Sequence, residues 1–535
     1  MKLKKVISSA LCVAMATVLL AGCANGGKNS TSSNGSENAI GNASENVSEE
    51  KTNSSEVVDE GVDLSKHVTL SLYLYGSPGV ANADILAEIN RKLKEDINTS
   101  IEIKYIDWGD IATKYPLLWA AGESFDMAYS SVTAPVPYYT LAKQGSLYDI
   151  SKILDKAPTL KAAIPETSWA AAESGEGIYG VPTLGAGYTV NGFVYNKANC
   201  TAWGIEPVTD LKSLIAYCDA SVAHDIYPFN GNAEVAMDFY KMLVDSTGNW
   251  VPAPGVAETE MYLVAKDYNN VQDIIHPAFT DEFANFVTML DEWEAKGYWS
   301  TDILSAQTDD KEMYKNLQSS AYITHMADWT GNYTAVHGQL ENQDIDAWYF
   351  AEDNNKVMQS SPAQDMTVIN TNSKYPERCL LVIEKLMTDE SYYRLFQYGI
   401  EGRQYDIVDG YLEKPASFDD TVDGGGFAGW AFSNSAFQIP SKSEHPSRYE
   451  KLAEWSKNFI SNPYNGFIFS SSAVAGELSA ISNVNSTLGI QLMLGKTNDV
   501  ASAIEEYRSQ LKKAGVDVVI DELKSQLQSF TSAGK

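Results

Sequence analysis

The chain has 535 residues, with 39 Lys and Arg against 70 Asp and Glu, a net charge of -31 and 44% hydrophobic residues. That length and apolar content suffice for more than one domain with a large core, which excludes disorder throughout. The acidic surplus repels phosphate groups, so we expect no nucleic-acid partner. The His and Cys residues are few and scattered, which favours neither a metal site nor a disulfide framework, and we expect no cofactor.

The N-terminus predicts export and anchoring. Lys2, Lys4 and Lys5 precede an apolar run too short to span a membrane comfortably, and the run ends in Leu-Ala-Gly-Cys at residues 20–23. This ending resembles the bacterial lipobox, which implies a signal peptide over residues 1–22 and a diacylglycerol on Cys23. The alternative is an ordinary cleaved signal with an incidental Cys. Residues 23–65 are polar and predict a flexible tether, so the lipid on Cys23 is expected to hold the protein at the outer face of the cell membrane.

The folded part opens with a strand–helix–strand pattern. Apolar residues alternate from Val68 to Leu74, and then Ile85, Ile89 and Leu93 recur at helical spacing, with Asn82 or Asp84 as the cap. A second alternating run, residues 101–105, completes a βαβ unit with a parallel sheet.

Later segments continue the α/β pattern. We expect a mostly helical region over residues 209–297, including an apolar helical stripe that ends near Gly297. Further strands are predicted at residues 125–129 and 321–326, and further helices at residues 116–121, 379–386, 392–398 and 504–511. Three thiols, Cys200, Cys218 and Cys379, are expected to be buried.

Several motifs resemble sites without meeting their requirements. Residues 175–180 spell G-x-G-x-x-G, but no strand precedes them and no helix follows, so a turn is predicted. Residues 419–430 begin like a calcium loop, but Trp430 stands where a bidentate Glu is needed. No catalytic motif is present, and we expect a protein that is not an enzyme. A glycan hydrolase remains the enzymatic alternative, because it needs only two carboxylates.

Several strings resemble one family. They are AAGESFDMA at 120–128, GSLYDI at 145–150, GIYGVP at 177–182, GIEGRQY at 399–405 and KAGVD at 513–517. In this order they resemble the extracellular solute-binding proteins of ABC importers, of the family 1-like carbohydrate type. The last two resemble the Gram-positive lipoproteins of that family that carry a C-terminal domain of unknown function.

The resemblance implies a fold and a mode of action. It implies a two-lobed, type II periplasmic-binding-protein-like α/β fold with a hinge and a ligand cleft between the lobes. We expect residues 66–185 and 350–398 in the first lobe, and residues 186–349 and 399–535 in the second, including the C-terminal domain. It further implies a monomer that closes on a small solute and delivers it to ABC permease subunits.

A sugar is the expected solute, because aromatic rings and polar side chains together suit its C–H faces and hydroxyls. Trp329 follows a strand where sugar-binding relatives place a stacking ring, and Asp328 beside it is a candidate acceptor. Strand ends are where open α/β sheets bind ligands, which adds Tyr75, Tyr129, Ser130 and Ser131. For all of these residues the alternative is a core or loop role.

Other candidates lie at the crossings between lobes and in the C-terminal third. They are Thr183, Glu401, Arg403, Tyr405, Trp430 and Asn434. Residues 401–405 also fit a structural turn in which an internal Glu–Arg pair fixes the hinge. A peptide receptor is the alternative within the same class, and a surface adhesin without a transporter is another alternative.

Overall fold

The computed structural model describes residues 61–532 except 123, 186, 255–260, 339–343 and 428. The predicted signal peptide, the lipidated Cys23 and most of the tether therefore lie outside the described residues. Contacts group residues 61–535 into one unit. Within the part that is described, no helix combines the length and the apolar character needed to cross a membrane.

The first lobe is built on a five-stranded sheet, and its opening βαβ unit confirms the pattern read from the sequence. β1 pairs in parallel with β2 and with β3, whereas β13 joins antiparallel and pairs with both β3 and β6. In spatial order the strands are β2 (Thr99–Ile106), β1 (Val68–Tyr75), β3 (Met127–Ser130), β13 (Met366–Ile369) and β6 (Gly180–Pro182).

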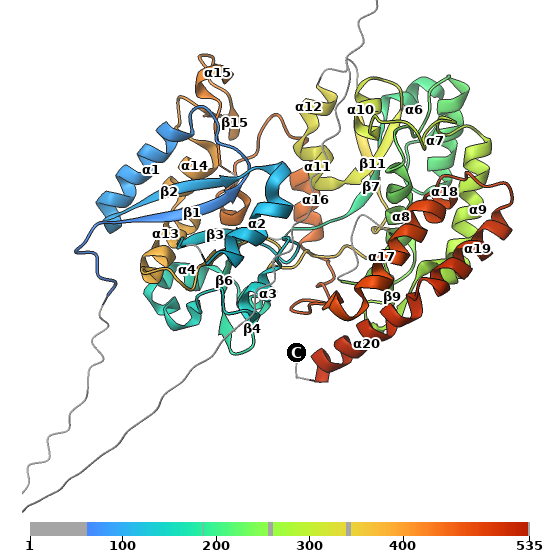
Figure 1. Ribbon diagram of the computed structural model, residues 1–535. Coiled ribbons are helices and arrows are strands. Elements are labelled where there is room, and N and C mark those ends of the chain that lie inside the picture. The colour runs from blue at the N-terminus through green and yellow to red at the C-terminus, as the bar shows by residue number, and fades with distance from the viewer. Residues whose placement is uncertain are drawn as a thin grey trace, which may run out of the picture. The chain divides into compact units, whose positions relative to one another are not determined.

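Helices flank this sheet (Figure 1). They are α1 (Asn82–Ile97), α2 (Ile111–Ala120), α3 (Tyr138–Lys143), α4 (Pro158–Ala163), α5 (Glu166–Ala171), α13 (Pro376–Thr388) and α14 (Glu390–Tyr398). The stripe Ile85, Ile89 and Leu93 of α1 is fully buried, as predicted. The predicted cap is wrong, because Ala81 occupies the cap position without a side-chain bond. Asn82 instead holds Gly426, donating to its carbonyl and accepting from its N–H.

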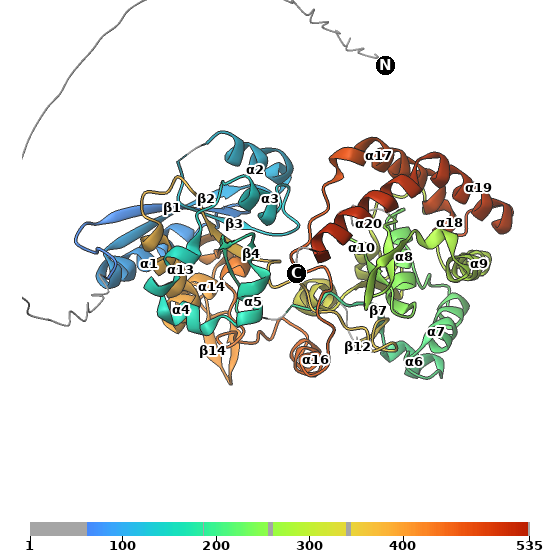
Figure 2. The same ribbon diagram turned by 90° about the horizontal axis from the view of Figure 1, so that it is seen from below.

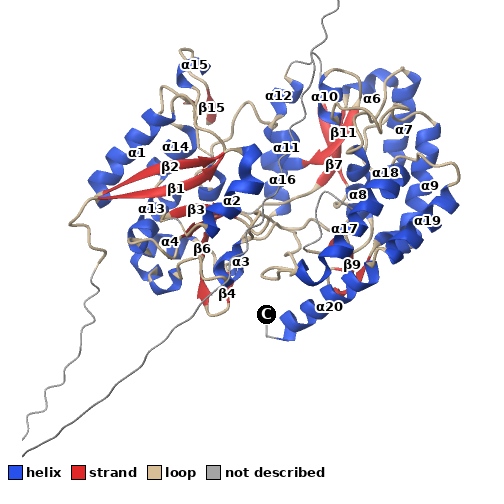
Figure 3. Ribbon diagram, in the orientation of Figure 1, coloured by secondary structure: helices blue, strands red, loops and turns tan. Residues whose placement is uncertain are grey.

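The second lobe contains two small antiparallel sheets. The first consists of β11 (Ala321–His325), β7 (Asn191–Asn196) and β12 (Ile345–Tyr349), and the second of β10 (Asn270–Ile275), β9 (Val264–Asp267) and β8 (Val251–Pro252). β8 to β10 lie inside the region predicted as mostly helical, so that prediction missed a sheet. Each sheet is flanked by helices (Figure 3).

The helices of the second lobe fall into an earlier and a C-terminal set. The earlier helices are α6 (Ala198–Trp203), α7 (Leu211–Ala223), α8 (Val235–Ser246), α9 (Asp281–Ala295), α10 (Asp310–Lys315), α11 (Met326–Gly331), α12 (Tyr333–His337) and α16 (Ser447–Trp455). The C-terminal set is α17 (Ala475–Val484), α18 (Ile490–Met493), α19 (Val500–Lys513) and α20 (Val516–Ser532). The C-terminal helices lie together (Figure 2), and their apolar residues join the core of the second lobe.

The predicted boundary at residue 399 is corrected by the structure. Ala431 and Phe432 are fully buried in the core of the first lobe, and Phe427 and Trp430 pack against it. The same stretch contains the hairpin β14 (Asp406–Val408) and β15 (Tyr411–Glu413) and the short helix α15 (Asp420–Asp423). No local pattern predicts this return, because the contacts that hold it, such as Asn82 to Gly426, join residues far apart in the chain.

The chain crosses between the lobes in three segments that pair with one another. Leu184, just after β6, forms a bridge with Asn434, and Tyr188 forms one with Gln359. The Ser360 N–H donates to the carbonyl of Gly187 at 2.8 Å. Backbone hydrogen bonds therefore bind the segments around residues 184–188, 359–360 and 434 into one connection.

Two local predictions are confirmed. The G-x-G-x-x-G stretch is a hairpin in which β4 (Glu173–Ser174) pairs with β5 (Gly177–Ile178) around Gly175, whose φ of 66° favours glycine. Cys200, Cys218 and Cys379 are buried free thiols, and burial raises the pKa of Cys200 to about 11.

Candidate ligand-binding site

A cavity of about 620 Å³ opens among segments from both lobes. The lining of the first lobe comes from Val132, Thr133, Pro137 and Tyr139, that of the crossings from Thr189, Asn191, Met358, Gln359, Ser360, Ser361 and Gln364, and that of the second lobe includes Lys241, Asp245, Trp250, Pro252, Ala253, Pro254 and Tyr262. A fourth wall is the segment Asn462–Phe469 near the start of the C-terminal region. The cavity therefore depends on parts of the chain that are hundreds of residues apart.

The lining combines aromatic rings with uncharged polar groups. The rings belong to Tyr139, Trp250, Tyr262, Tyr464, Phe467 and Phe469. The polar groups are those of Thr133, Thr189, Asn191, Gln359, Ser360, Ser361, Gln364, Asn462 and Asn465. Such a lining can hold a ligand through ring faces and through donors and acceptors at once.

Hydrogen bonds fix two ionisable side chains, Lys356 and Asp245, on one side of the cavity. Lys356 is 5% exposed, and its Nζ donates to the carbonyls of Val244 at 2.7 Å and Thr247 at 3.1 Å, near the end of α8. Burial lowers the pKa of Lys356 to about 8, against the attraction of Asp245. Asp245 accepts from Asn191 Nδ2 at 2.8 Å, and burial raises the pKa of its carboxyl group. Both side chains already have hydrogen-bond partners within the protein, so they fix the position of this wall.

An aromatic cluster lies at the carboxyl edge of the first-lobe sheet. It consists of Tyr75, Trp108, Tyr129 and Trp430. Tyr75 meets Tyr129 with ring centroids 4.8 Å apart, and Trp108 meets Trp430 at 5.7 Å. Trp108 is 59% exposed, whereas the Tyr75 hydroxyl is buried without a hydrogen-bond partner among the described residues. Burial therefore raises the pKa of Tyr75.

Polar contacts connect this cluster to the cavity. Tyr129 donates to Asp365 Oδ1 at 2.8 Å, and burial raises the pKa of both groups. The preceding residue, Gln364, donates from Nε2 to Thr133 Oγ1 at 3.1 Å, and Thr133 shares a hydrogen bond with Ser131 at 3.0 Å. Gln364 and Thr133 line the cavity.

The structure thus brings four of the predicted residues, Tyr75, Tyr129, Ser131 and Trp430, close to the cavity without placing them in its lining. Ser130 is different, since it is fully buried and its Oγ accepts from Tyr115. Ser130 belongs to the core.

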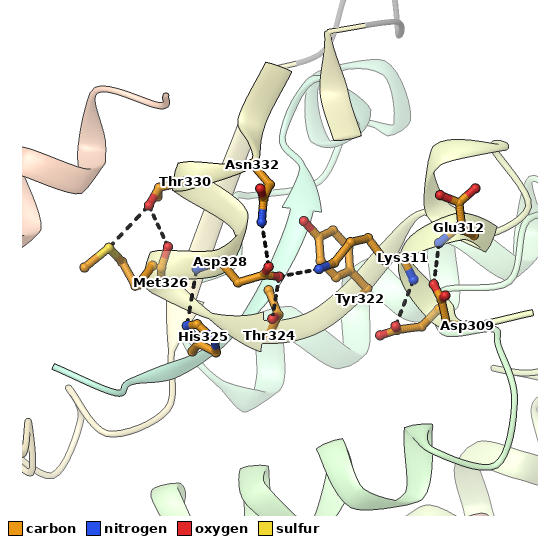
Figure 4. A network of polar contacts seen from close by, with 12 residues as sticks. Asp309, Lys311, Glu312, Tyr322, Thr324, His325, Met326, Asp328, Thr330 and Asn332 are labelled. Atoms are coloured by element: carbon orange, nitrogen blue, oxygen red, sulfur yellow. Dashed lines mark hydrogen bonds and ion pairs between the residues drawn. The ribbon is translucent and has the colours of Figure 1, made fainter. Parts of the chain in front are cut away.

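Trp329 and Asp328 lie away from the cavity, which corrects the first expectation for both. Trp329 is 1% exposed, donates from Nε1 to Tyr349 Oη at 3.0 Å and packs against His445. Asp328 forms an ion pair with Lys311 at 2.6 Å and accepts from Thr324 at 3.0 Å (Figure 4). Burial opposes ionisation, but the bond and charge of Lys311 hold the pKa of Asp328 below its usual range.

His325, the last residue of β11, is the member of this region that lines the cavity. Its Nδ1 accepts from the Asp328 N–H at 3.2 Å and caps α11 (Figure 4). The end of β11 therefore reaches the cavity through His325, and not through Trp329 or Asp328.

Residues 401–405 form a structural turn. Arg403 pairs with Asp84 of α1 and with Asp423 of α15, both at 2.8 Å, so its partners are not Glu401. Glu401 and Tyr405 form a backbone bridge, and Tyr405 is buried against Tyr398. None of the three lines the cavity, and the alternative of a turn describes them better than a ligand role.

Thr183 and Asn434 belong to the crossings. Asn434 is buried, donates from Nδ2 to the Met387 carbonyl at 2.8 Å and accepts from the Ala436 N–H at 3.0 Å. Thr183 lies directly between β6 and Leu184, which bridges to Asn434. Asn434 therefore helps to hold the connection between the lobes, Thr183 lies within it, and neither lines the cavity.

Most of the lining was missed by sequence reasoning. Lys241, Asp245, Trp250 and Tyr262 come from α8 and the overlooked sheet region, where no motif marks them. Asn462 to Gly466 contain a turn-forming N-x-Y-N-G string that could have drawn attention to an exposed loop. Among the described residues, no group of three or more His, Cys, Asp or Glu is arranged to hold a metal ion.

Comparison with known proteins connects this architecture to a family. Residues 463–532 match the model of a domain of unknown function, DUF3502. A carbohydrate ABC transporter substrate-binding protein of Streptococcus pneumoniae is 22% identical over 488 residues, which cover 89% of this chain and 93% of that protein.

Solved structures share the fold. The N-glycan transport solute-binding protein NgtS of S. pneumoniae matches with a TM-score of 0.70 at 20% identity, over 87% of this chain and all of that one. A solute-binding protein of Bifidobacterium longum infantis, described as binding HMO, matches with a TM-score of 0.63 at 16% identity, over 86% of this chain and 98% of that one. The resemblance drawn from the sequence is confirmed: the chain has the two-lobed, type II periplasmic-binding-protein-like fold of the ABC-transporter solute-binding proteins and carries a DUF3502 domain at its C-terminal end.

Proposed function

We propose that this chain is the extracellular receptor of an ABC importer for an uncharged oligosaccharide. The observation that carries the proposal is the cavity of about 620 Å³, whose lining combines aromatic rings with amide and hydroxyl groups. Its volume falls within the roughly 300–1,000 Å³ of small-ligand pockets. Rings suit the C–H faces of sugars, and amides pair with hydroxyls that would otherwise be buried without partners.

Two further facts support this ligand class. NgtS, whose fold this chain shares, has been solved with Man1GlcNAc and with Man5GlcNAc. The charged groups of the lining, Lys241, Lys356 and Asp245, are engaged by the protein itself, while the chain as a whole carries a charge of -31. An anionic solute would meet a repulsive field, so a neutral one is favoured.

Capture works through the two lobes. The cavity takes its lining from both lobes and from the paired crossings, so a ligand that touches every wall favours the arrangement in which these walls are close. A permease then recognises the liganded form. In this proposal the receptor is a monomer that is held at the outer face of the cell membrane by a diacylglycerol on Cys23, and no catalytic step is involved.

The test is a thermal-shift and calorimetry screen of the purified protein against a glycan panel with Man1GlcNAc, Man5GlcNAc, maltotriose and laminaritriose, with trialanine for comparison. A ligand at 100 times its dissociation constant stabilises the folded protein by about 2.7 kcal/mol. A shift with trialanine and none with any glycan would replace the oligosaccharide by a peptide. Release of reducing ends from a bound glycan would contradict a purely binding role.

A further inference from the structure

The DUF3502 domain begins within a wall of the cavity. The domain match starts at residue 463, and residues Asn462 and Tyr464 to Phe469 line the cavity. Just before them, Ile460 runs parallel to the crossing that enters the first lobe. Its N–H donates to the Val357 carbonyl at 2.8 Å, and its carbonyl accepts from the Gln359 N–H at 2.9 Å. The backbone of the crossing therefore fixes where this segment enters the wall.

The segment touches both lobes through alternating side chains. Phe467 and Phe469 are buried in the core of the second lobe, whereas Ile468 between them packs against the core of the first. Gly466, with a φ of 81°, makes the turn that precedes them. A ligand held by this segment is therefore held at the point where the two lobes meet.

Two polar atoms of the segment are buried without partners. Tyr464 is 7% exposed, and neither its hydroxyl nor Asn465 Oδ1 forms a hydrogen bond with any residue that the structure describes. Buried polar groups normally find a partner, because an unpaired group loses its hydration without compensation. Elsewhere in the same domain Tyr507 follows that rule and donates to Asn485 Oδ1 at 2.7 Å. The exception falls where the domain lines the cavity.

We propose that the DUF3502 domain takes part directly in ligand binding, with the Tyr464 hydroxyl and the Asn465 amide forming hydrogen bonds to hydroxyl groups of the oligosaccharide. Tyr464 supplies a donor and Asn465 Oδ1 an acceptor, and a sugar hydroxyl can serve either. The inference rests on the proposed function, since it needs a ligand rich in hydroxyls. It gives the domain a role as the fourth wall of the site.

The test compares matched tyrosine variants in the purified full chain by calorimetry with each panel glycan that binds the wild type. Tyr464→Phe removes one oxygen, and we expect the affinity to fall about 3- to 10-fold, as for the loss of one hydrogen bond. The melting temperature without glycan should stay the same or rise, because the hydroxyl has no partner in the free protein. Asn465→Ala should also weaken binding. In the control, Tyr507→Phe should lower the melting temperature and leave the affinity unchanged.

The outcomes separate the two proposals. If the wild type binds none of the glycans, the proposed function fails, and this inference fails with it. If the wild type binds and both Tyr464→Phe and Asn465→Ala retain its affinity, the DUF3502 role alone is overturned. Should either variant prove unfolded without glycan, the affinity of the other decides.

Discussion

Two strand ends, one in each lobe, place tryptophans in what look like equivalent positions. In the first lobe β2 ends at Ile106, and Trp108 follows it, lies near Gly76 at the end of β1 and stays 59% exposed. In the second lobe β11 ends at His325 and runs directly into α11, where Trp329 is 1% exposed.

The difference lies in what covers the ring. α11 packs against α16, and the connection is fixed by Arg448, which donates to the Ala327 carbonyl at 3.1 Å, and by His445, whose N–H donates to the Thr330 carbonyl at 2.9 Å. No comparable helix buries Trp108, whose nearest ring is that of Trp430. A strand end indicates a region of interest, but the segment packed over it decides whether a ring is available to a ligand.

The largest effect is expected at the buried ring. Trp329→Ala removes a fully packed side chain and the donor to Tyr349, so the free energy of unfolding should fall by about 3–5 kcal/mol. Urea denaturation measures this loss. The fraction that remains folded should bind a panel glycan with unchanged affinity. If the variant kept its stability but lost its affinity for the glycans, Trp329 would belong to the ligand-binding site after all.

The exposed ring should behave in the opposite way. Trp108→Ala removes a largely solvated side chain that packs against Trp430 at a tilted angle, in the aromatic cluster. We expect a loss of affinity of about 10-fold, or about 1.4 kcal/mol, if the aromatic cluster extends the binding surface to longer oligosaccharides. Calorimetry with Man1GlcNAc and Man5GlcNAc tests this, because the longer glycan should lose more.

Leu117 offers the matched control. It is also exposed, at 64%, and lies on α2 outside the cavity lining and the aromatic cluster. Leu117→Ala should leave the affinity for both glycans unchanged. Equal affinities of wild type and Trp108→Ala for the two glycans would limit the binding site to the cavity.

The sequence predicted the elements better than the site. Strand β1, helix α1 and strand β2 follow from alternation and from the spacing of Ile85, Ile89 and Leu93, which are local patterns. Tyr75, Tyr129 and Ser131 also follow from a local rule, because carboxyl ends of strands share one edge of a sheet. Local sequence patterns therefore identify the carboxyl edge of the first-lobe sheet.

The cavity itself depends on contacts that leave no local trace. Tyr464 borders it because Ile460 pairs with Met358, and Trp430 reaches the first lobe because the neighbouring Ala431 and Phe432 return to its core. Arg403 illustrates the same limit, since its partners Asp84 and Asp423 lie 319 and 20 residues away. Side chains that look alike in sequence differ in role according to such distant pairings.

The charged groups near the end of β11 predict that the stability of the protein depends on pH. Burial, together with the negative charge of Asp238, raises the pKa of Asp310 to about 8, although Lys311 is close by. The folded protein then keeps a proton that the unfolded chain releases near pH 4, so stability should fall as the pH rises from about 4 to 8. Asp310→Asn removes this titratable group. The loss in free energy of unfolding with rising pH should therefore be smaller in the variant, by about 1 kcal/mol or more.

Urea denaturation of both proteins at pH 5 and pH 8 provides the measurement. In the first lobe, Asp107→Asn is the control, since its exposed carboxyl group has a pKa lowered by Ser77 and Gly109 and should not contribute in this window. Identical pH profiles for wild type and Asp310→Asn would show that Asp310 is ionised in the folded state.

The smallest effect is expected at Arg403, the residue of the C-terminal third that looked most like a ligand contact. Its guanidinium bridges Asp84 and Asp423, each at 2.8 Å, on a partly exposed surface, where such pairs contribute little to stability. Arg403→Gln should therefore lower the free energy of unfolding only slightly at low salt, and this loss should shrink as salt is added, because both pairs are screened. Glycan affinity should not change, since the residue lies outside the cavity. A clear loss of affinity without a loss of stability would mean that the turn reaches the ligand when the lobes close, and it would make residues 401–405 part of the same surface as Trp430.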